Sequence, residues 1–176
     1  MGGAVASLAW TKISEATTAR AVSLPDLVQR STRIVRSLPL DSFARSEDIG
    51  GTRHIVTYTR LRLDEVIHGA TNEPEILVRT LGGTVGDLGE IVHGEADLAL
   101  NQACVLFLHT DSNGVEIVTA MAQGHYPLLD DAGTQRLRAS RNMPRLMGGA
   151  SSNAAVAQLD GLRFTEARSL ILGARH

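Results

Sequence analysis

Aromatic residues are scarce in this chain, making up only 3% of its 176 residues. A core of useful size must therefore be built from leucine, valine, isoleucine and alanine. Lysine is nearly absent as well: Lys12 is the only one, and arginine supplies the remaining fixed positive charge. The formal net charge of −2 argues against a general binder of nucleic acid or of another polyanion.

The chain has one cysteine, Cys104, which excludes an internal disulfide. It precedes the apolar run 105–108, and this setting favours a buried, unreactive thiol. No stretch approaches the roughly 20 apolar residues that a membrane-spanning helix needs, so no membrane span is expected. With 43% hydrophobic and 20% charged residues, the composition is that of an ordinary globular domain with short appendages.

Residues 1–21 differ in pattern from the rest of the chain. The apolar stretch Gly2–Trp10 is followed by a polar segment that ends in Ala19-Arg20-Ala21. A short apolar stretch before an A-x-A site is typical of a secretory signal peptide, although no basic residue precedes it here. The pattern predicts a periplasmic or extracellular protein that is cleaved after Ala21. A disordered or loosely docked N-terminus is the alternative.

The stretch His54–Gly69 carries the clearest structural pattern. It is rich in valine, isoleucine, threonine and leucine in nearly regular alternation, which predicts a β-strand. Leu61 and Leu63 mark one face, yet Val56 and Tyr58 have the parity of the opposite, arginine-bearing face. A flat strand with one buried side cannot change its apolar side, whereas a bulged or strongly coiled barrel strand can.

Further strands and two helices complete the expected domain. Ser23 as N-cap and Pro25 in the first turn predict a helix over residues 24–32, and a terminal helix is expected over 162–172. Pro39 makes the first strand either an edge strand or a bulged one. The glycine-rich segment 82–89 is expected to be an irregular loop. The remaining predicted strands cover residues 34–45, 75–81, 103–109, 115–122, 126–129 and 135–139.

These elements predict an all-β fold with flanking helices. The architecture that fits best is a small closed OB-like β-barrel of five to six strands, with a two-sheet sandwich as the alternative. The chain then divides into the N-terminal segment 1–21, a β-barrel domain 22–145, a linker 146–161 and a C-terminal helix 162–176.

Three segments resemble a family of exported bacterial proteins with the pattern LVxRSxxIV, VxEVxxG and VRTxGG. The matching residues are Leu27–Arg36, Tyr58–Gly69 and Glu75–Gly83, and the resemblance spans roughly residues 24–138. It implies a secreted protein. The plan is also similar to the OB-like barrel of tissue inhibitors of metalloproteinases and netrin-like modules. Because the N-terminal cysteine and the disulfides of those inhibitors are missing here, this second resemblance implies a fold and not their mechanism.

Loops at a barrel rim often carry binding residues, so the segment from Gly82 onward is the first choice of interaction surface. It is not a phosphate-binding loop, because the Gly-Lys-Ser/Thr ending and a following helix are both missing. Asp87, Glu90, His93, Glu95 and Asp97 form an acidic cluster without the EF-hand pattern, so a solvated loop is favoured over a calcium site. The predicted binding residues are Gly83, Gly86, Asp87, Glu90 and His93.

Catalytic and metal-binding motifs are missing from the sequence. There is no HExxH or GxSxG, and the other histidines are scattered singly, so we predict no enzyme, no cofactor and no metal site. Arg60, Arg62 and Arg79 can share an outer barrel face, but single-stranded nucleic acid also needs exposed aromatics. Pairing of these arginines with nearby acids is therefore favoured; the acids are Asp64, Glu65 and Glu75.

The sequence therefore favours a non-catalytic, exported β-barrel module that binds another protein, such as an extracytoplasmic peptidase or an envelope component. A cytoplasmic single-stranded nucleic-acid-binding OB module is one alternative. A structural subunit of a self-assembly is another, since an edge strand such as Ile34–Leu40 can pair between chains. A metal-dependent enzyme built on His93 and the neighbouring acids is the third.

Overall fold

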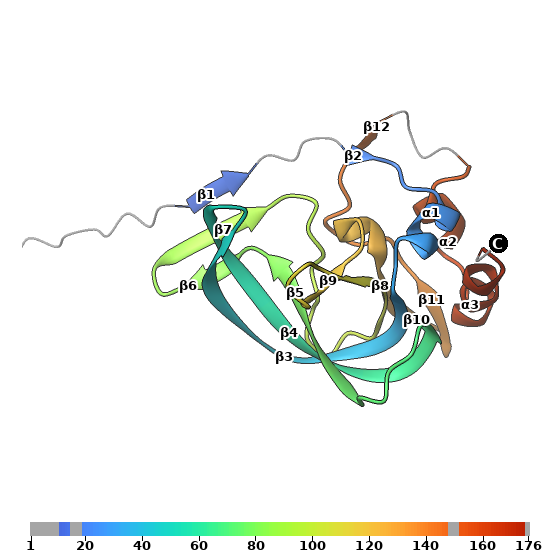
Figure 1. Ribbon diagram of the computed structural model, residues 1–176. Coiled ribbons are helices and arrows are strands. Elements are labelled where there is room, and N and C mark those ends of the chain that lie inside the picture. The colour runs from blue at the N-terminus through green and yellow to red at the C-terminus, as the bar shows by residue number, and fades with distance from the viewer. Residues whose placement is uncertain (1–10, 15–18, 148–151, 175–176) are drawn as a thin grey trace, which may run out of the picture.

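A computed structural model describes residues 11–14, 19–147 and 152–174 (Figure 1). Its central feature is a hairpin of two strands, β3 (Arg33–Ile49) and β4 (Thr52–His68), each 17 residues long. Gly50 and Gly51 make the turn with φ values of 60° and 81°, a conformation that glycine adopts without strain. Figure 1 shows the two strands curving together across the domain, with the helices at one end and β6 and β7 at the other.

Five strands form a ring around one part of the core. β4 pairs with β5 (Glu75–Leu81), which pairs in parallel with β9 (Glu116–Val118). β9 also pairs with β8 (Cys104–Thr110), and β8 returns to β3 over Arg33–Ser37. A strand of only three residues, β9, closes the ring, so the sheet is ring-like and not a clean barrel. The predicted all-β fold with flanking helices is confirmed.

The long hairpin is bulged, as the change of apolar side predicts. Its register shifts at three places: between Ile34 and Val35, between Arg36 and Ser37, and between Pro39 and Asp41. The bulges re-aim the side chains, so that Val56 and Leu61, of opposite parity, are both fully buried.

Pro39 lies at one of these bulges and not on an edge strand. β3 pairs with β4 on one side and, over Arg33–Ser37, with β8 on the other. β8 therefore covers the part Ile34–Ser37 of the edge that was expected over Ile34–Leu40.

Strand β8 separates two hydrophobic clusters. Cys104, Leu106 and Leu108 face the cluster inside the ring, whereas Val105 and Phe107 face the cluster beneath the helices. All five are buried, which confirms that both faces of this strand are covered. Burial raises the pKa of the Cys104 thiol to about 12, as expected for an unreactive cysteine.

The helices cover the second cluster. α1 (Leu24–Gln29) starts at Ser23, whose Oγ accepts a hydrogen bond from the Asp26 N–H at 3.2 Å. α2 (Ala155–Leu159) and α3 (Phe164–Gly173) bury Leu159 and Ile171 in the same cluster. The segment 146–161, expected to be a linker, thus contains β12 (Leu146–Met147) and α2. A hairpin of β10 (His125–Asp131) and β11 (Thr134–Leu137) extends the sheet from β8.

The glycine-rich segment 82–89 is not an irregular loop. It contains β6 (Gly83–Val85) and the start of β7 (Leu88–Val92), which pair antiparallel. Gly86 lies in the connecting turn with φ 58°. The glycines thus permit a tight turn and a close approach to β4, which is a different use of the same conformational freedom.

Two N-terminal strands add to strand edges in parallel. β1 (Thr11–Ser14) pairs with β7, and β2 (Ala19–Arg20) pairs with β12. The other residues of the expected signal-peptide core, 1–10, and residues 15–18 lie outside the described part of the chain. Within the described residues, no helix has the length and apolar character needed to cross a membrane.

Candidate functional site

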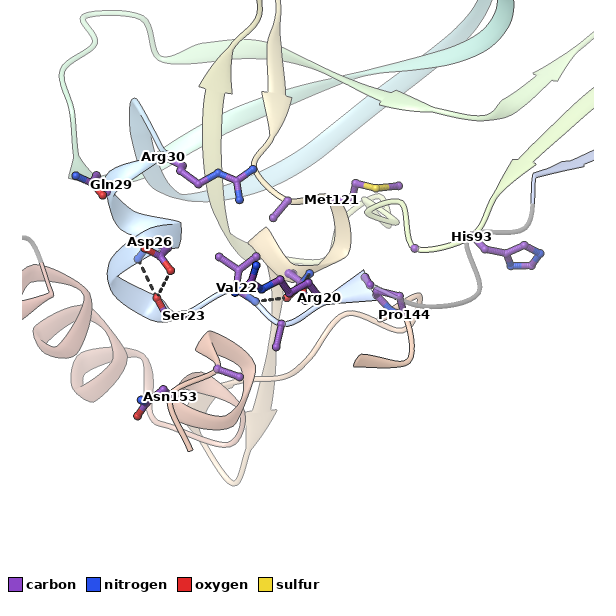
Figure 2. A pocket seen from close by; sticks show the side chains of 16 residues that line it. Arg20, Val22, Ser23, Asp26, Gln29, Arg30, His93, Met121, Pro144 and Asn153 are labelled. Carbon is purple, nitrogen blue, oxygen red and sulfur yellow. Dashed lines mark hydrogen bonds between the residues drawn. The ribbon is translucent and has the colours of Figure 1, made fainter. Parts of the chain in front are cut away.

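A cavity of about 740 Å³ lies where the chain enters the domain (Figure 2). We call it the N-terminal cavity. The extended segment 19–23 forms one of its walls, and α1 and the 3-10 helix η1 (Met121–Gly124) form others. This places residues that are about 100 positions apart in sequence around one space.

Gln123 is the central side chain of this cavity wall. It is only 6% exposed, and its amide bonds to the main chain of the extended segment at both ends. The Val22 N–H donates to its Oε1 at 2.9 Å, and its Nε2 donates to the Arg20 carbonyl oxygen at 3.1 Å. A side-chain amide thus occupies the position that a neighbouring strand would have, because it offers one acceptor and one donor.

Other main-chain groups hold the same segment from its flanks. The Ala19 N–H donates to the carbonyl oxygen of Arg145 at 3.1 Å, next to the pairing of β2 with β12. The Ala155 N–H donates to the Val22 carbonyl oxygen at 2.8 Å. Segment 19–22 is therefore bound mainly through its backbone, as a strand is in a sheet.

The backbone of η1 is unusual on the side that faces the cavity. Ala120 and Met121 both have positive φ, 57° and 56°, which is costly for residues other than glycine. A Cβ added to Gly124 would overlap the carbonyl oxygen of Thr119. Strain of this kind persists only where the surroundings enforce it, and it is common at functional sites. The sequence predicts a strand over 115–122 here, and the structure has only β9 and then η1.

Charged groups line the rim of the N-terminal cavity. Asp26 and Arg30 come from the region of α1, and Asp26 accepts a hydrogen bond from the Ser23 hydroxyl at 2.6 Å. Figure 2 shows His93 on the opposite side of the cavity from these residues. Of the five predicted binding residues, His93 alone lines this cavity.

Another cavity, of about 550 Å³, lies at the mouth of the strand ring. We call it the barrel-mouth groove. Its floor consists of hydroxyl groups of β4 and β5, and β6, β7 and the segment 95–98 form its sides. Gly83 and Glu90, two further predicted residues, line it. The mouth of a barrel is a common place for a ligand site.

Glu90 is buried in the groove wall, where it joins β7 to β4. Its Oε1 lies 2.8 Å from His54 Nδ1, and its Oε2 accepts the Ile55 N–H at 2.6 Å. The remaining predicted residues, Gly86 and Asp87, lie at the β6–β7 turn and line neither cavity. The structure therefore divides the predicted cluster among three places.

Glu95 is a second buried carboxylate of the barrel-mouth groove, with 9% exposure. Its Oε1 accepts the Ala96 N–H at 2.9 Å and its Oε2 the Leu81 N–H at 3.1 Å. Burial raises the pKa of this carboxyl, and the two N–H groups offset part of that effect. No basic side chain of the described residues forms an ion pair with it.

Comparisons with known proteins give no family. No protein-family model matches the chain, and no curated protein matches it. The geometry of the two cavities is therefore the basis for assigning a function.

The outer arginine face is neutralised by ion pairs. Arg60 pairs with Asp41 and with Glu75, and Arg79 bridges Glu47 and Asp111 at 3.3 and 2.7 Å. An exposed aromatic is present, since the Phe43 ring stacks on Tyr58 with centroids 5.4 Å apart. With its arginines paired, this face lacks the free positive charge that tracks a nucleic-acid backbone.

Groupings that suggest catalysis are few in the described part of the chain. His125 Nδ1 lies 3.0 Å from the Ser140 Oγ, but both residues are buried, 3% exposed each, and neither lines a cavity described above. Among the described residues, no group of three or more His, Cys, Asp or Glu side chains is arranged to hold a metal ion.

Proposed function

We propose that this protein is a non-catalytic, exported β-barrel module that binds another protein by holding an extended segment of it in the N-terminal cavity. The observation that carries the proposal is the Gln123 amide, which bonds to both the N–H and the C=O of an extended main chain. Recognition through the main chain tolerates many sequences, as in other cases of strand addition.

In this structure the chain already adds two of its own strands to strand edges of the domain. The edge of β12 accepts β2 in parallel, and the edge of β7 accepts β1 in parallel. In both cases the added strand is short and comes from the N-terminal region, so the domain has two edges that receive extended chain. A partner segment of similar backbone geometry would find the same donors and acceptors.

The predicted cleavage after Ala21 would remove the chain's own strand from the edge of β12 and leave that edge free for a partner. It would remove β2 and the Arg20 carbonyl that accepts from Gln123 Nε2, while Val22 would stay as the new N-terminus. The freed edge of β12 and the freed amide donor would then be satisfied by a partner, because leaving them unpaired and buried is costly. An extracytoplasmic peptidase or an envelope protein is the class of partner that export favours.

A site-specific photo-crosslinking experiment tests this proposal. A photoreactive amino acid replaces Met121, which lines the cavity, and the altered protein is expressed in the organism that produces it naturally. A matched control carries it at Leu129 of β10, which is 44% exposed and away from the cavity. We expect a crosslinked partner protein at position 121 and none at 129, together with an N-terminus at Val22 by mass spectrometry.

The substitution Gln123→Ala should abolish the crosslink at position 121. Circular dichroism and urea unfolding would check that this variant remains folded. Equal crosslinking at positions 121 and 129, or a crosslink that is indifferent to Gln123, would contradict the proposal. An N-terminus that still contains residues 1–21 would contradict the export part separately.

A further inference from the structure

We propose that the barrel-mouth groove binds an organic cation through an ammonium or guanidinium group. The proposal rests on the side chains of this groove and is independent of the peptide-binding function proposed for the N-terminal cavity. Its central observation is a hydroxyl group that has no hydrogen-bond partner among the described residues, on a residue that is only 2% exposed and lines the groove beside oxygen atoms that can only accept.

Thr59 supplies that hydroxyl. The residue is only 2% exposed, lies on β4 and lines the groove. Its side chain makes no hydrogen bond with any residue in the described part of the chain. The hydroxyl oxygen is not among the enclosed unpaired side-chain atoms of the described residues, so it opens into the groove, where a ligand can reach it.

The two threonines beside it have already used their protons. The Thr57 hydroxyl donates to the Gly82 carbonyl oxygen at 2.7 Å, and the Thr80 hydroxyl donates to the Thr57 carbonyl oxygen at 3.4 Å. Each hydroxyl has one proton and two lone pairs, so these two oxygens can only accept from a group in the groove. A ligand rich in N–H donors suits this floor, and a ligand of acceptors does not.

Carboxylates on the sides of the groove add the matching charge. Glu95 is buried, and its two oxygens each accept one backbone N–H, which leaves lone pairs for a further donor. Asp97 lies in the same wall, and no lysine, arginine or histidine occurs among the described residues that line the groove. A cation would gain charge-assisted hydrogen bonds here, whereas an anion would meet only repulsion.

The arrangement favours an organic cation over a metal ion. No three metal-ligating side chains converge anywhere in the described part of the chain, whereas hydroxyl and carboxylate oxygens are spread over a groove of about 550 Å³. An ammonium or guanidinium group directs several N–H donors outward and can reach oxygens spread in this way. Such a group can come from a small amine or from a lysine or arginine side chain of a polypeptide.

NMR titration of the full-length protein tests the proposal. The probes are n-butylammonium chloride, the capped peptide Gly-Gly-Lys-Gly-Gly and, as a neutral control of the same shape as the amine, butan-1-ol. We expect both cationic probes to shift the amide signals of Thr59, Thr80 and Glu95 and the alcohol to leave them unchanged. Tighter binding of the amine identifies a small-molecule site, and tighter binding of the peptide identifies a side-chain site.

Variants of the groove make the test specific. Glu95→Gln should weaken binding about tenfold or more, because a charge-assisted hydrogen bond is lost. Thr59→Val, which keeps the shape, should weaken it severalfold. Asp87→Asn removes the same charge as Glu95→Gln at a turn outside the groove and should leave the affinity unchanged.

The chain's only lysine must be controlled for. The backbone of Lys12 in β1 pairs with that of Glu90, so each titration is repeated with Lys12→Ala. Binding in either background that needs Glu95 and Thr59 supports the proposal. It is overturned if neither background binds the cations, or if Glu95→Gln and Thr59→Val, both folded, bind them as well as the unaltered chain does.

Discussion

The two cavities of this domain differ in the groups that they offer. In the N-terminal cavity, the side chain of Gln123 and the flanking strands contact main-chain groups of an extended segment. In the barrel-mouth groove, threonine hydroxyls and carboxylates surround a space that no described basic side chain lines. The two proposals therefore assign recognition of a backbone to one place in this fold and recognition of a charge to another. Both proposals rest on a few polar groups and not on the strand ring itself.

The two regions also contain buried titratable groups whose pKa values are shifted in opposite directions by the same cause, desolvation. Burial lowers the pKa of His125, which follows η1, to about 4. Burial raises the pKa of Glu95 in the groove. In both cases desolvation disfavours the charged form, which for histidine is the protonated form and for glutamate is the ionised form. Acidification should therefore reduce the contribution of His125 to the free energy of unfolding, and it should remove the cost of burying the ionised form of Glu95.

The largest expected effect is the loss of the η1 wall in Gly124→Ala. The new methyl group would overlap the backbone oxygen of Thr119, which cannot move aside as the end of a side chain can. Overpacking of this kind should lower the free energy of unfolding by about 3 kcal/mol. Urea unfolding measures it, with Gly173→Ala as control because no atom lies within 4 Å of that site. If both variants are equally stable, Gly124 is not packed closely against the backbone of Thr119.

The pH dependence contributed by His125 comes next. Its unfolded pKa is near 6.5 and its folded pKa about 4, so the unfolded chain binds the proton first as pH falls. Its contribution to stability is present above pH 6.5 and is lost as pH falls toward 4. The loss between pH 7 and 4.5 should be about 2 kcal/mol, and His125→Gln should lack it. Urea unfolding of both proteins at the two pH values gives the difference directly.

Glu95 should show the opposite sign. Its folded pKa lies above the unfolded value of 4.5, so the cost of burying the ionised form is full at neutral pH and disappears as pH falls below 4.5. Relative to Glu95→Gln, the unaltered chain should therefore gain stability on acidification. Parallel unfolding curves of the two proteins at pH 7 and pH 4.5 test this sign. A gap that does not change with pH would show that Glu95 is not desolvated.

The smallest effect is expected at the turn that separates β6 from β7. Asp87 is exposed and lines neither cavity, so Asp87→Asn should change the free energy of unfolding by less than about 0.5 kcal/mol. Crosslinking at Met121 should also be unchanged. A strong effect of this substitution on crosslinking would show that the β6–β7 turn is part of the interaction surface. The partner would then contact more of the domain than the N-terminal cavity.

Local pattern predicted most elements of the fold. The strand Glu75–Leu81, the long strand around His54–Gly69 and the start of α1 at Ser23 were all predictable, because alternation and capping are properties of neighbouring residues. The failures have a common cause. The glycines of 82–89 permit either a loop or a tight hairpin, and only the pairing of β7 with β6 and β1, with hydrogen bonds to β4, selects the hairpin.

The candidate site was predictable only in part. Gly83 and Glu90 line the barrel-mouth groove and His93 lines the N-terminal cavity, although their proximity in sequence suggested one surface. Thr59 and Gln123 carried no signal. A threonine in a β-strand is ordinary, and a glutamine before a glycine indicates only a bend. Their importance depends on burial and on partners that are far away along the chain.

The sequence by itself determined the all-β class, the bulged central strand, the inert Cys104 and the two faces of β8, since each follows from the order of apolar and polar residues. Only the tertiary structure decided that Gln123 would meet Arg20 and Val22, and that Glu95 and Thr59 would line one groove at the mouth of the ring. The physical reason is that hydrogen bonding and desolvation depend on which distant groups share a space. The closing of the ring, and not any local pattern, brings those groups together.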